Sequence, residues 1–401
     1  MKKIVLWVVA ILSAGYSFSQ EPLVKANNNF TFRIYRATRP DTGNFFISPF
    51  SLSTAMSIVN EGSATTTRVE MDDLLSTGPV NNQSSAYMEL LHKTLQTNER
   101  STCFLDSENN NSKNELLLAN SLWIRDDTPI KENYKRVVET DYQSDVFSFS
   151  KNDLSGAGQQ LDNWIAKKTS GKISGMELSA DARMSIINAI YFMGEWQDPF
   201  QKTETKERNF HSLSKEKVKM DFLNKESRLD YYENEDMQCV GIPYNCNEFS
   251  MVILLPKKRF GIITLEEKLT AEYFSTINLY PASMVILSVP KFRIESEVRP
   301  ISNIEAMGYS EMFSDHADFS GISDTTLKIG SIIHKTFIEV NEARTEAAAV
   351  TEVEMVVTGG GGGQPAEPPQ PKIFNANHSF VFLIVDNRSK AILFIGRVTG
   401  K

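Results

Sequence analysis

The chain has 401 residues, of which 41% are hydrophobic and 23% are charged. This composition is ordinary for a soluble globular protein, and it excludes a mostly disordered chain and a multi-span membrane protein. The formal net charge of -8 argues against a protein that binds nucleic acid or an anionic membrane, because a net negative field repels both.

Residues 1–19 have the pattern of an export signal. Two lysines precede an apolar run from Ile4 to Leu12, and the small-x-small cleavage site Ser17-Phe18-Ser19 follows. The apolar run is too short to span a bilayer. We expect a signal peptide over 1–19, a mature chain from Gln20, and export to the periplasm or the extracellular medium. The basic start is typical of a bacterial signal, and the alternative is an uncleaved amphipathic segment.

Helical patterns dominate the first half of the mature chain. Ser48-Pro49 precedes a helix with one apolar face and a stop at Gly62, and the face consists of Leu52, Ala55, Met56 and Val59. A second helix is predicted over 161–169 and is closed by Ser170-Gly171.

Strand-like apolar runs dominate the remainder. They cover 115–124, 184–196, 250–256, 284–296 and 379–398. The last of these runs reads as two strands around a DNRS turn. Helices mixed with long strands, without regular alternation, predict one large α+β domain with several sheets over 20–401.

Cysteines and histidines give no support for a metal site. Cys103, Cys239 and Cys246 include no CxxC pair, and their odd number leaves at least one unpaired. Cys239 and Cys246 flank an expected turn, and whether they pair stays open. The five histidines show no HExxH spacing.

Motifs for catalysis are also absent from the sequence. There is no GxSxG elbow and no glycine-rich phosphate loop. Ser148 and Ser212 each precede a lysine by three positions, a spacing that arises by chance in polar sequence. We expect a protein that is not an enzyme, with no catalytic residues, no metal and no cofactor.

The segment 342–358, EARTEAAAVTEVEMVVT, carries two competing signals. Glu346 to Ala349 favours a helix by intrinsic propensity. Read with a period of two, the segment is a half-buried strand of about 43 Å at roughly 3.3 Å per residue. Its small or apolar face consists of Thr345, Ala347, Ala349, Thr351, Val353, Met355 and Val357. The alternatives left open are a plain edge strand and a surface helix.

Residues 359–371, GGGGGQPAEPPQP, follow directly and have little to bury. Five glycines impart flexibility and the prolines stiffness, so we expect an exposed surface loop. A linker between domains is disfavoured, because the strands that follow are too short and too apolar to stand alone.

Several motifs in order resemble one family. VNEARTEAAAVT at 340–351 is similar to the proximal hinge of the serpins, VNEEGTEAAAAT. NFFISPFSLSTAMSIVNEGS at 44–63, NAIYFMGEWQDPF at 188–200 and the closing FNANHSFVFLIVDNRSKAILFIGRV resemble further serpin motifs. The resemblance covers nearly the whole mature chain. The sequence departs from the pattern at Arg344, where the family has glycine. The loop after the expected cleavage point is about eight residues longer than in common serpins.

The resemblance implies the serpin fold, a single domain with a large central sheet, further β-sheets, about eight to nine helices and an exposed reactive loop at about 342–372. It also implies a suicide-substrate protease inhibitor, in which the cleaved loop inserts into the central sheet and traps the protease. The hinge would consist of Glu342, Arg344, Thr345, Glu346, Ala347, Ala348 and Ala349. Counting seventeen residues from Glu342 places the reactive bond at Thr358-Gly359, with Val357-Thr358 as the alternative.

The residues around this bond suggest the partner. No lysine or arginine occurs between Arg344 and Lys372, so a trypsin-like protease lacks a basic anchor. Val356, Val357 and Thr358 fit a small pocket, which favours elastase-like serine proteases, while Met355 keeps cysteine and chymotrypsin-like proteases as secondary targets. We expect a monomer that binds a protease and neither nucleic acid nor membrane.

The alternative is a non-inhibitory serpin that acts as a binding or carrier protein. Arg344 supports it, because arginine restricts the hinge backbone where glycine would swing freely. If Thr345 faces inward, however, Arg344 faces outward and need not bury its charge, and we expect insertion to survive.

Overall fold

The computed structural model describes residues 20–78, 80, 83–95, 114–279, 282–342 and 370–400. The predicted signal peptide lies outside these residues. The described helices are α1 (Gln20–Thr38), α2 (Pro49–Asn60), α3 (Thr65–Leu75), α4 (Gln83–Leu95), α6 (Glu132–Thr140), α7 (Leu154–Lys168), α8 (Ile262–Lys268), α9 (Ala271–Ser275) and α10 (Ile301–Ala306). Within the described residues these nine helices agree with the expected number.

The strands in the same ranges form two sheets. The five-stranded sheet has the order β10-β11-β4-β2-β3, and the nine-stranded sheet has the order β1-β14-β13-β8-β7-β6-β9-β12, with β5 paired to β6. The bounds are β1 (Phe45–Ile47), β2 (Glu115–Arg125), β3 (Asp145–Phe149), β4 (Met184–Met193), β5 (Lys206–His211), β6 (Lys217–Glu233), β7 (Met237–Pro243), β8 (Phe249–Pro256), β9 (Ala282–Pro290), β10 (Phe292–Val298), β11 (Ser331–Val340), β12 (Lys372–Asn375), β13 (Phe380–Asp386) and β14 (Ile392–Val398). The predicted α+β class is confirmed.

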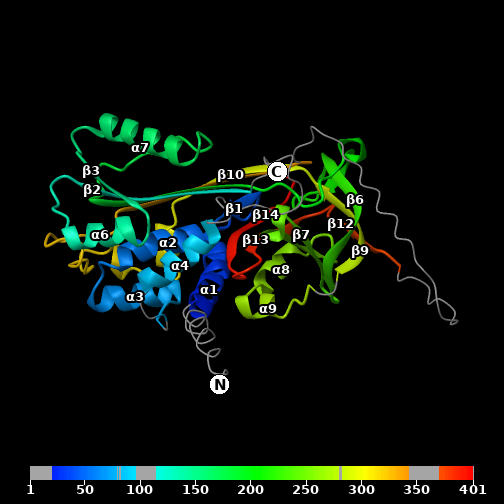
Figure 1. The fold of residues 1–401 in the computed structure, drawn as a ribbon, viewed down its shortest axis with the longest axis horizontal. Coiled ribbons are helices and arrows are strands. Elements are labelled where there is room, and N and C mark those ends of the chain that lie inside the picture. The colour runs from blue at the N-terminus through cyan, green and yellow to red at the C-terminus, as the bar shows by residue number, and fades with distance from the viewer. Residues whose placement is uncertain are drawn as a thin grey trace, which may run out of the picture.

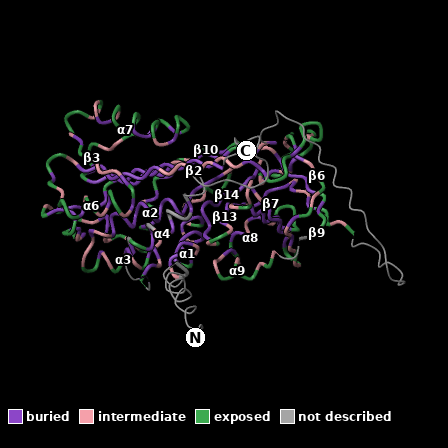
Figure 2. Tube along the Cα trace, viewed as in Figure 1, coloured by how far each residue is buried: buried purple, intermediate pink, exposed green. Residues whose placement is uncertain are grey.

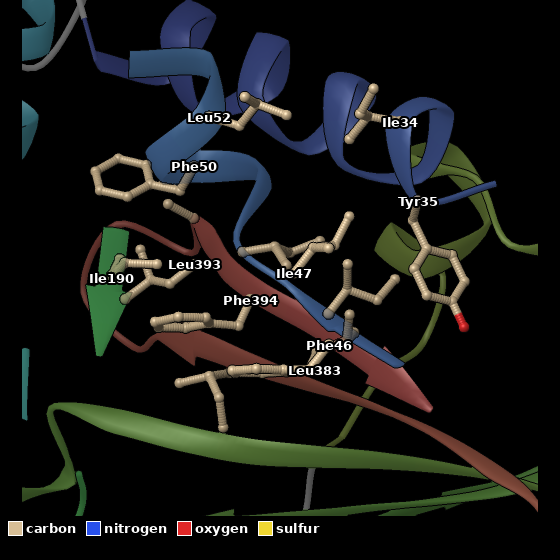
Figure 3. Packing of buried hydrophobic residues seen from close by; sticks show 14 of the residues in the cluster. Ile34, Tyr35, Phe46, Ile47, Phe50, Leu52, Ile190, Leu383, Leu393 and Phe394 are labelled. Atoms are coloured by element: carbon tan, nitrogen blue, oxygen red, sulfur yellow. The ribbon is translucent and has the colours of Figure 1, made fainter. Parts of the chain in front are cut away.

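Helix α2 begins where the sequence placed it. The Ser48 side chain caps it by accepting a 3.1 Å hydrogen bond from the Ser51 amide, and Pro49 occupies the first turn. Every residue of α2 is buried, because the helix lies inside the molecule, whereas the sequence predicted a single apolar face. Figure 3 shows Phe50 of α2 close to Ile190 of β4 and Leu393 of β14.

Helix α7 lies on the opposite side of the five-stranded sheet from α2, α3 and α6 (Figure 1). It is longer than the predicted 161–169, because the Asp153 side chain accepts a 2.9 Å hydrogen bond from the Gly156 amide and starts the helix there. Its end agrees with the prediction, since Gly171 adopts a φ of 71° just beyond it. The buried face of α7 and the sheet residues that it covers form a second, smaller hydrophobic cluster.

The run 284–296 is two strands and not one, which corrects the prediction. The chain passes from β9 in one sheet to β10 in the other at Lys291, whose amide bonds the Asp221 carbonyl at 2.7 Å. The closing hairpin is confirmed as β13 and β14 around the DNRS turn, and all residues of both strands are buried. Figure 2 shows how burial follows the sheets while the outer helices keep an exposed side.

Among the described residues, no helix combines the length and the apolar character of a membrane span. In the same part of the chain, no group of three or more histidine, cysteine, aspartate or glutamate side chains is arranged to hold a metal ion. Cys239 is a buried free thiol, and Cys246 is disulfide-bonded, so these two cysteines do not pair with each other.

Candidate functional site

The candidate site is the junction between β11 and β4 in the five-stranded sheet. These strands run parallel and pair over seven residues, from Ser331 opposite Ser185 to Phe337 opposite Tyr191. On their outer sides, β11 pairs antiparallel with β10, and β4 pairs antiparallel with β2. A strand added between β11 and β4 in the opposite direction would therefore form antiparallel ladders with both neighbours.

The chain is connected so that such a strand could follow β11. Strand β11 ends at Val340, immediately before the segment that the sequence predicts as a half-buried strand. A segment that reversed its direction after Val340 would run antiparallel to both β11 and β4. The topology thus provides a place for the predicted strand, although β4 and β11 pair directly with each other in this structure.

Glu342 is held firmly at the end of β11. Its side chain is buried, accepts a 2.7 Å hydrogen bond from Thr205 Oγ1, and forms a 2.9 Å ion pair with Lys291 Nζ. Burial alone would raise the pKa of Glu342, but the hydrogen bonds from Thr205 and Lys291 outweigh it, and the pKa is lowered. Glu342 is therefore an anionic anchor at neutral pH for the chain that follows.

Trp196 fixes the residue before this anchor. Its Nε1 donates a 3.0 Å hydrogen bond to the Asn341 carbonyl, and its ring stacks on Tyr244 at 4.5 Å between centroids. Gly194 makes this packing possible, because a Cβ atom there would lie 2.3 Å from the Tyr244 ring. Trp196 and Gly194 belong to the motif 188–200, which the sequence singled out without a role.

Of the predicted site residues, the structure places only Glu342. Arg344, Thr345, Glu346, Ala347, Ala348 and Ala349 of the hinge, and Val357, Thr358 and Gly359 of the reactive bond, lie outside the described residues. Their roles stay predictions.

Sequence reasoning missed a buried polar network that crosses the junction. Asn120 of β2, Asn188 of β4 and His334 of β11 lie opposite one another in adjacent strands. The Asn188 amide donates to Asn120 Oδ1 and to Ser51 of α2, and His334 Nδ1 bonds Asn188 Oδ1. Polar residues inside largely apolar strands were the available signal, but only the register shows that Asn120, Asn188 and His334 meet.

The tautomer of His334 follows from its partners. The Ser48 amide donates to Nε2 at 3.0 Å, so Nε2 is the acceptor and Nδ1 carries the proton that bonds Asn188. Protonation of Nε2 would set two donors against each other. Complete burial disfavours the imidazolium and lowers the pKa of His334 to about 3.

We expect His334 to make stability fall on acidification. Because its folded-state pKa of about 3 lies below the ordinary 6.5, the unfolded chain binds more protons between these values, and stability is lost as pH falls through this window. The loss is at most about 1.4 kcal/mol per pH unit. Urea unfolding between pH 7 and pH 4 would measure it, and H334Q should show a shallower dependence than wild type.

The matched control for this prediction is H316Q, since His316 is exposed. This variant should keep the wild-type pH dependence, which includes the carboxylates that also titrate in the window. An H334Q protein that lost stability on acidification as steeply as wild type would contradict the assignment.

These observations define a class of protein, an α+β domain in which the chain leaves one strand beside a parallel junction that can accept a further strand. A model of the serpin family, described as serine protease inhibitor, matches residues 25–400. The chain therefore belongs to the serpin family, whose members are in general inhibitors of proteases and not catalysts.

Individual relatives agree with this assignment. An uncharacterized serpin-like protein of Methanosarcina acetivorans is 32% identical over 393 residues, which are 95% of this chain and 88% of that protein. Iripin-2 of Ixodes ricinus is 31% identical and covers 97% of this chain and 96% of its own length. The crystal structure of tengpin, a thermophilic serpin in its native state, matches with a TM-score of 0.79 at 26% identity and covers 94% of both chains.

Proposed function

We propose that this protein is an exported suicide-substrate inhibitor of elastase-like serine proteases. The serine of the protease attacks the carbonyl carbon of Thr358, an ester to the enzyme forms, and the bond to Gly359 breaks to release a new amino terminus. The freed segment 345–357 then enters between β11 and β4. The observation that carries the proposal is the parallel pairing of these strands beside the end of β11.

The inserted segment matches the junction in chemistry as well as direction. On the expected inward face, Thr345, Ala347 and Ala349 are small where the strands must first part. Val353, Met355 and Val357 are larger, and full burial stabilises each by about 1.5–3 kcal/mol. Further ladder hydrogen bonds contribute about 0.5–1.5 kcal/mol each.

The elastase-like specificity rests on small side chains at the reactive bond. Val356, Val357 and Thr358 fit a shallow pocket, and the nearest basic residues, Arg344 and Lys372, lie far from the bond in the sequence. Export rests on the signal pattern, and the disulfide at Cys246 supports it, because disulfides persist in oxidising compartments.

Incubation with pancreatic elastase tests the proposal. We expect a complex that resists denaturant, together with a carboxyl-terminal fragment that begins at Gly359 or, for the alternative bond, at Thr358. Trypsin is the control and should give little complex. Rapid cleavage without a stable complex would contradict trapping, and a fragment that begins outside 357–360 in mass spectrometry would contradict the placement of the bond.

The carrier function is the second candidate, and one cavity favours it. A hollow of about 890 Å³ lies between α1, α9 and the β13–β14 turn. Its walls combine apolar side chains, such as Val24 and Phe274, with polar ones, such as Asn28. Thermal melting after loop cleavage separates the two functions, because insertion raises the melting temperature and a carrier without insertion shows no rise.

A further inference from the structure

Three apolar side chains are exposed together on one face of the nine-stranded sheet. Met284 and Ile286 of β9 are 41% and 44% exposed, and Ile373 of β12 is 66% exposed. Ile373 lies directly opposite Ile286, and Met284 is two residues along the same strand, so all three point to the same side. Only two other large hydrophobic side chains are as exposed in the described part of the chain. Most of the exposed large hydrophobic side chains of these residues are therefore gathered at one place, as at an interaction surface.

Charged groups border these apolar side chains. Arg228 of β6 lies opposite Met284, and Glu226 lies opposite Ile286. Arg208 of β5 reaches across to donate a 3.1 Å hydrogen bond to Ser288 Oγ on β9. We call Arg208, Arg228, Met284, Ile286 and Ile373 the Ile286 face.

The Ile286 face is partly concave. A hollow of about 380 Å³ is lined by side chains that include Arg208, Ile286 and Ile373. Within the described ranges, neither Arg208 nor Arg228 has a carboxylate partner, whereas the nearby Lys206 pairs with Glu204 and Lys225 with Asp198. Glu204 and Glu226 also line this hollow. A concave surface with an apolar centre and two arginines that form no ion pair within these ranges suits a protein partner that carries carboxylates beside an apolar patch.

The position of the Ile286 face near the ends of the reactive segment indicates which partner it contacts. Glu342, the last described residue before the reactive segment, is held by Thr205, which precedes β5, and by Lys291, which follows β9. The chain returns as β12, which pairs with β9. The residues on both sides of the reactive segment therefore lie at the nine-stranded sheet, next to β5, β9 and β12. Figure 1 shows β6, β9 and β12 together at one end of the molecule.

We propose that the Ile286 face is a second contact surface for the target protease, which it binds outside the substrate cleft. The proposal rests on the proposed function, since the protease is the partner that the reactive segment holds beside this sheet. When one contact forms, the effective concentration for the other contact rises. A protease that makes both contacts therefore binds more tightly than one that has the same cleft specificity but does not contact the face. Arg208 and Arg228 favour an acidic surface on the partner, although the net charge of the whole chain is negative.

The experiment compares wild type with the double variant I286S/I373S and with R228E, which reverses a rim charge and leaves the apolar centre intact. The control is V69S, because Val69 is 70% exposed and belongs to α3, which lies at the other end of the molecule in Figure 1. The probes are pancreatic elastase, chymotrypsin and subtilisin, each in the active form and with its catalytic serine replaced by alanine. Association rates for trapping are measured with the active forms and dissociation constants with the inactive forms.

For at least one protease, we expect I286S/I373S to bind the inactive form about tenfold more weakly, R228E to bind it more weakly as well, and V69S to match wild type. The melting temperatures of all variants should match. If the double variant fails to fold, the binding of R228E alone tests the proposal. Equal binding by every variant to every protease would overturn the proposal. A dimer of wild type that I286S/I373S abolishes would assign the face to a second copy, which also overturns it.

The two measurements separate this inference from the proposed function. Trapping by wild type with unchanged binding in the variants would leave the inhibitor function standing and refute the second contact surface. Cleavage without trapping, but with weaker binding of the inactive protease by the variants, would refute the trap and support the surface.

Discussion

Under the proposed mechanism, T345R should turn this protein from an inhibitor of elastase into its substrate. Thr345 is the first residue of the predicted inward face, so arginine there would carry its charge between β11 and β4 as the segment enters. An unpaired buried charge costs several kcal/mol, and every 1.4 kcal/mol changes the partition between insertion and release about tenfold. The number of inhibitor molecules consumed per inactivated elastase should therefore rise at least about tenfold.

The neighbouring position provides the matched control. Glu346 lies on the opposite face of the predicted strand, so E346R places the same side chain where it can stay in solvent. This variant should trap elastase as wild type does. Equal loss in T345R and E346R would refute the assignment of faces. R344G addresses the hinge itself and should accelerate insertion, because glycine removes the backbone restriction that arginine imposes.

N188A should cause a large loss of stability. Asn188 bonds His334, Asn120 and Ser51, and these partners belong to three different elements around the junction. Removal of the amide leaves several buried polar groups without partners, each at a cost of about 1–3 kcal/mol. We expect about 3–5 kcal/mol less free energy of unfolding, measured by urea denaturation at neutral pH.

The network also joins β4 and β11, the two strands that the proposed insertion would separate. N188A should therefore lose inhibitory activity faster than wild type during incubation at a moderately raised temperature. N133A is the control, because Asn133 of α6 is exposed, and its unfolding free energy should change by less than about 0.5 kcal/mol. If N188A unfolded at the same urea concentration as N133A, a structural role for the network would be contradicted.

The features predicted correctly from the sequence depend on neighbours in the chain. Ser48 and Pro49 start α2 because a capping hydroxyl and a fixed proline φ act within one turn. The run 379–398 forms β13 and β14 because a DNRS turn separates two apolar stretches. The start of α7 was missed because Asp153 was not recognised as its cap.

The candidate site was only partly predictable. The hinge pattern located the chain that leaves β11, and Glu342 was named as part of it. Its contacts with Thr205 and Lys291 come from residues distant in the sequence, and no local pattern predicts them. The exposure of Ile286 and Ile373 was equally hidden, because an apolar residue in a strand has the same sequence signature on a buried and on an open face.

By itself, the sequence determined the α+β class, the start of α2, the closing hairpin and the resemblance to the serpins, because these follow from periodicity, turn chemistry and ordered motifs. Only the tertiary structure decided that β11 lies parallel to β4, that Asn120, Asn188 and His334 share one row, and that residues 284–296 divide between two sheets. The physical reason is that register and burial are set by contacts between distant segments, whose relative positions are fixed only when the whole core packs.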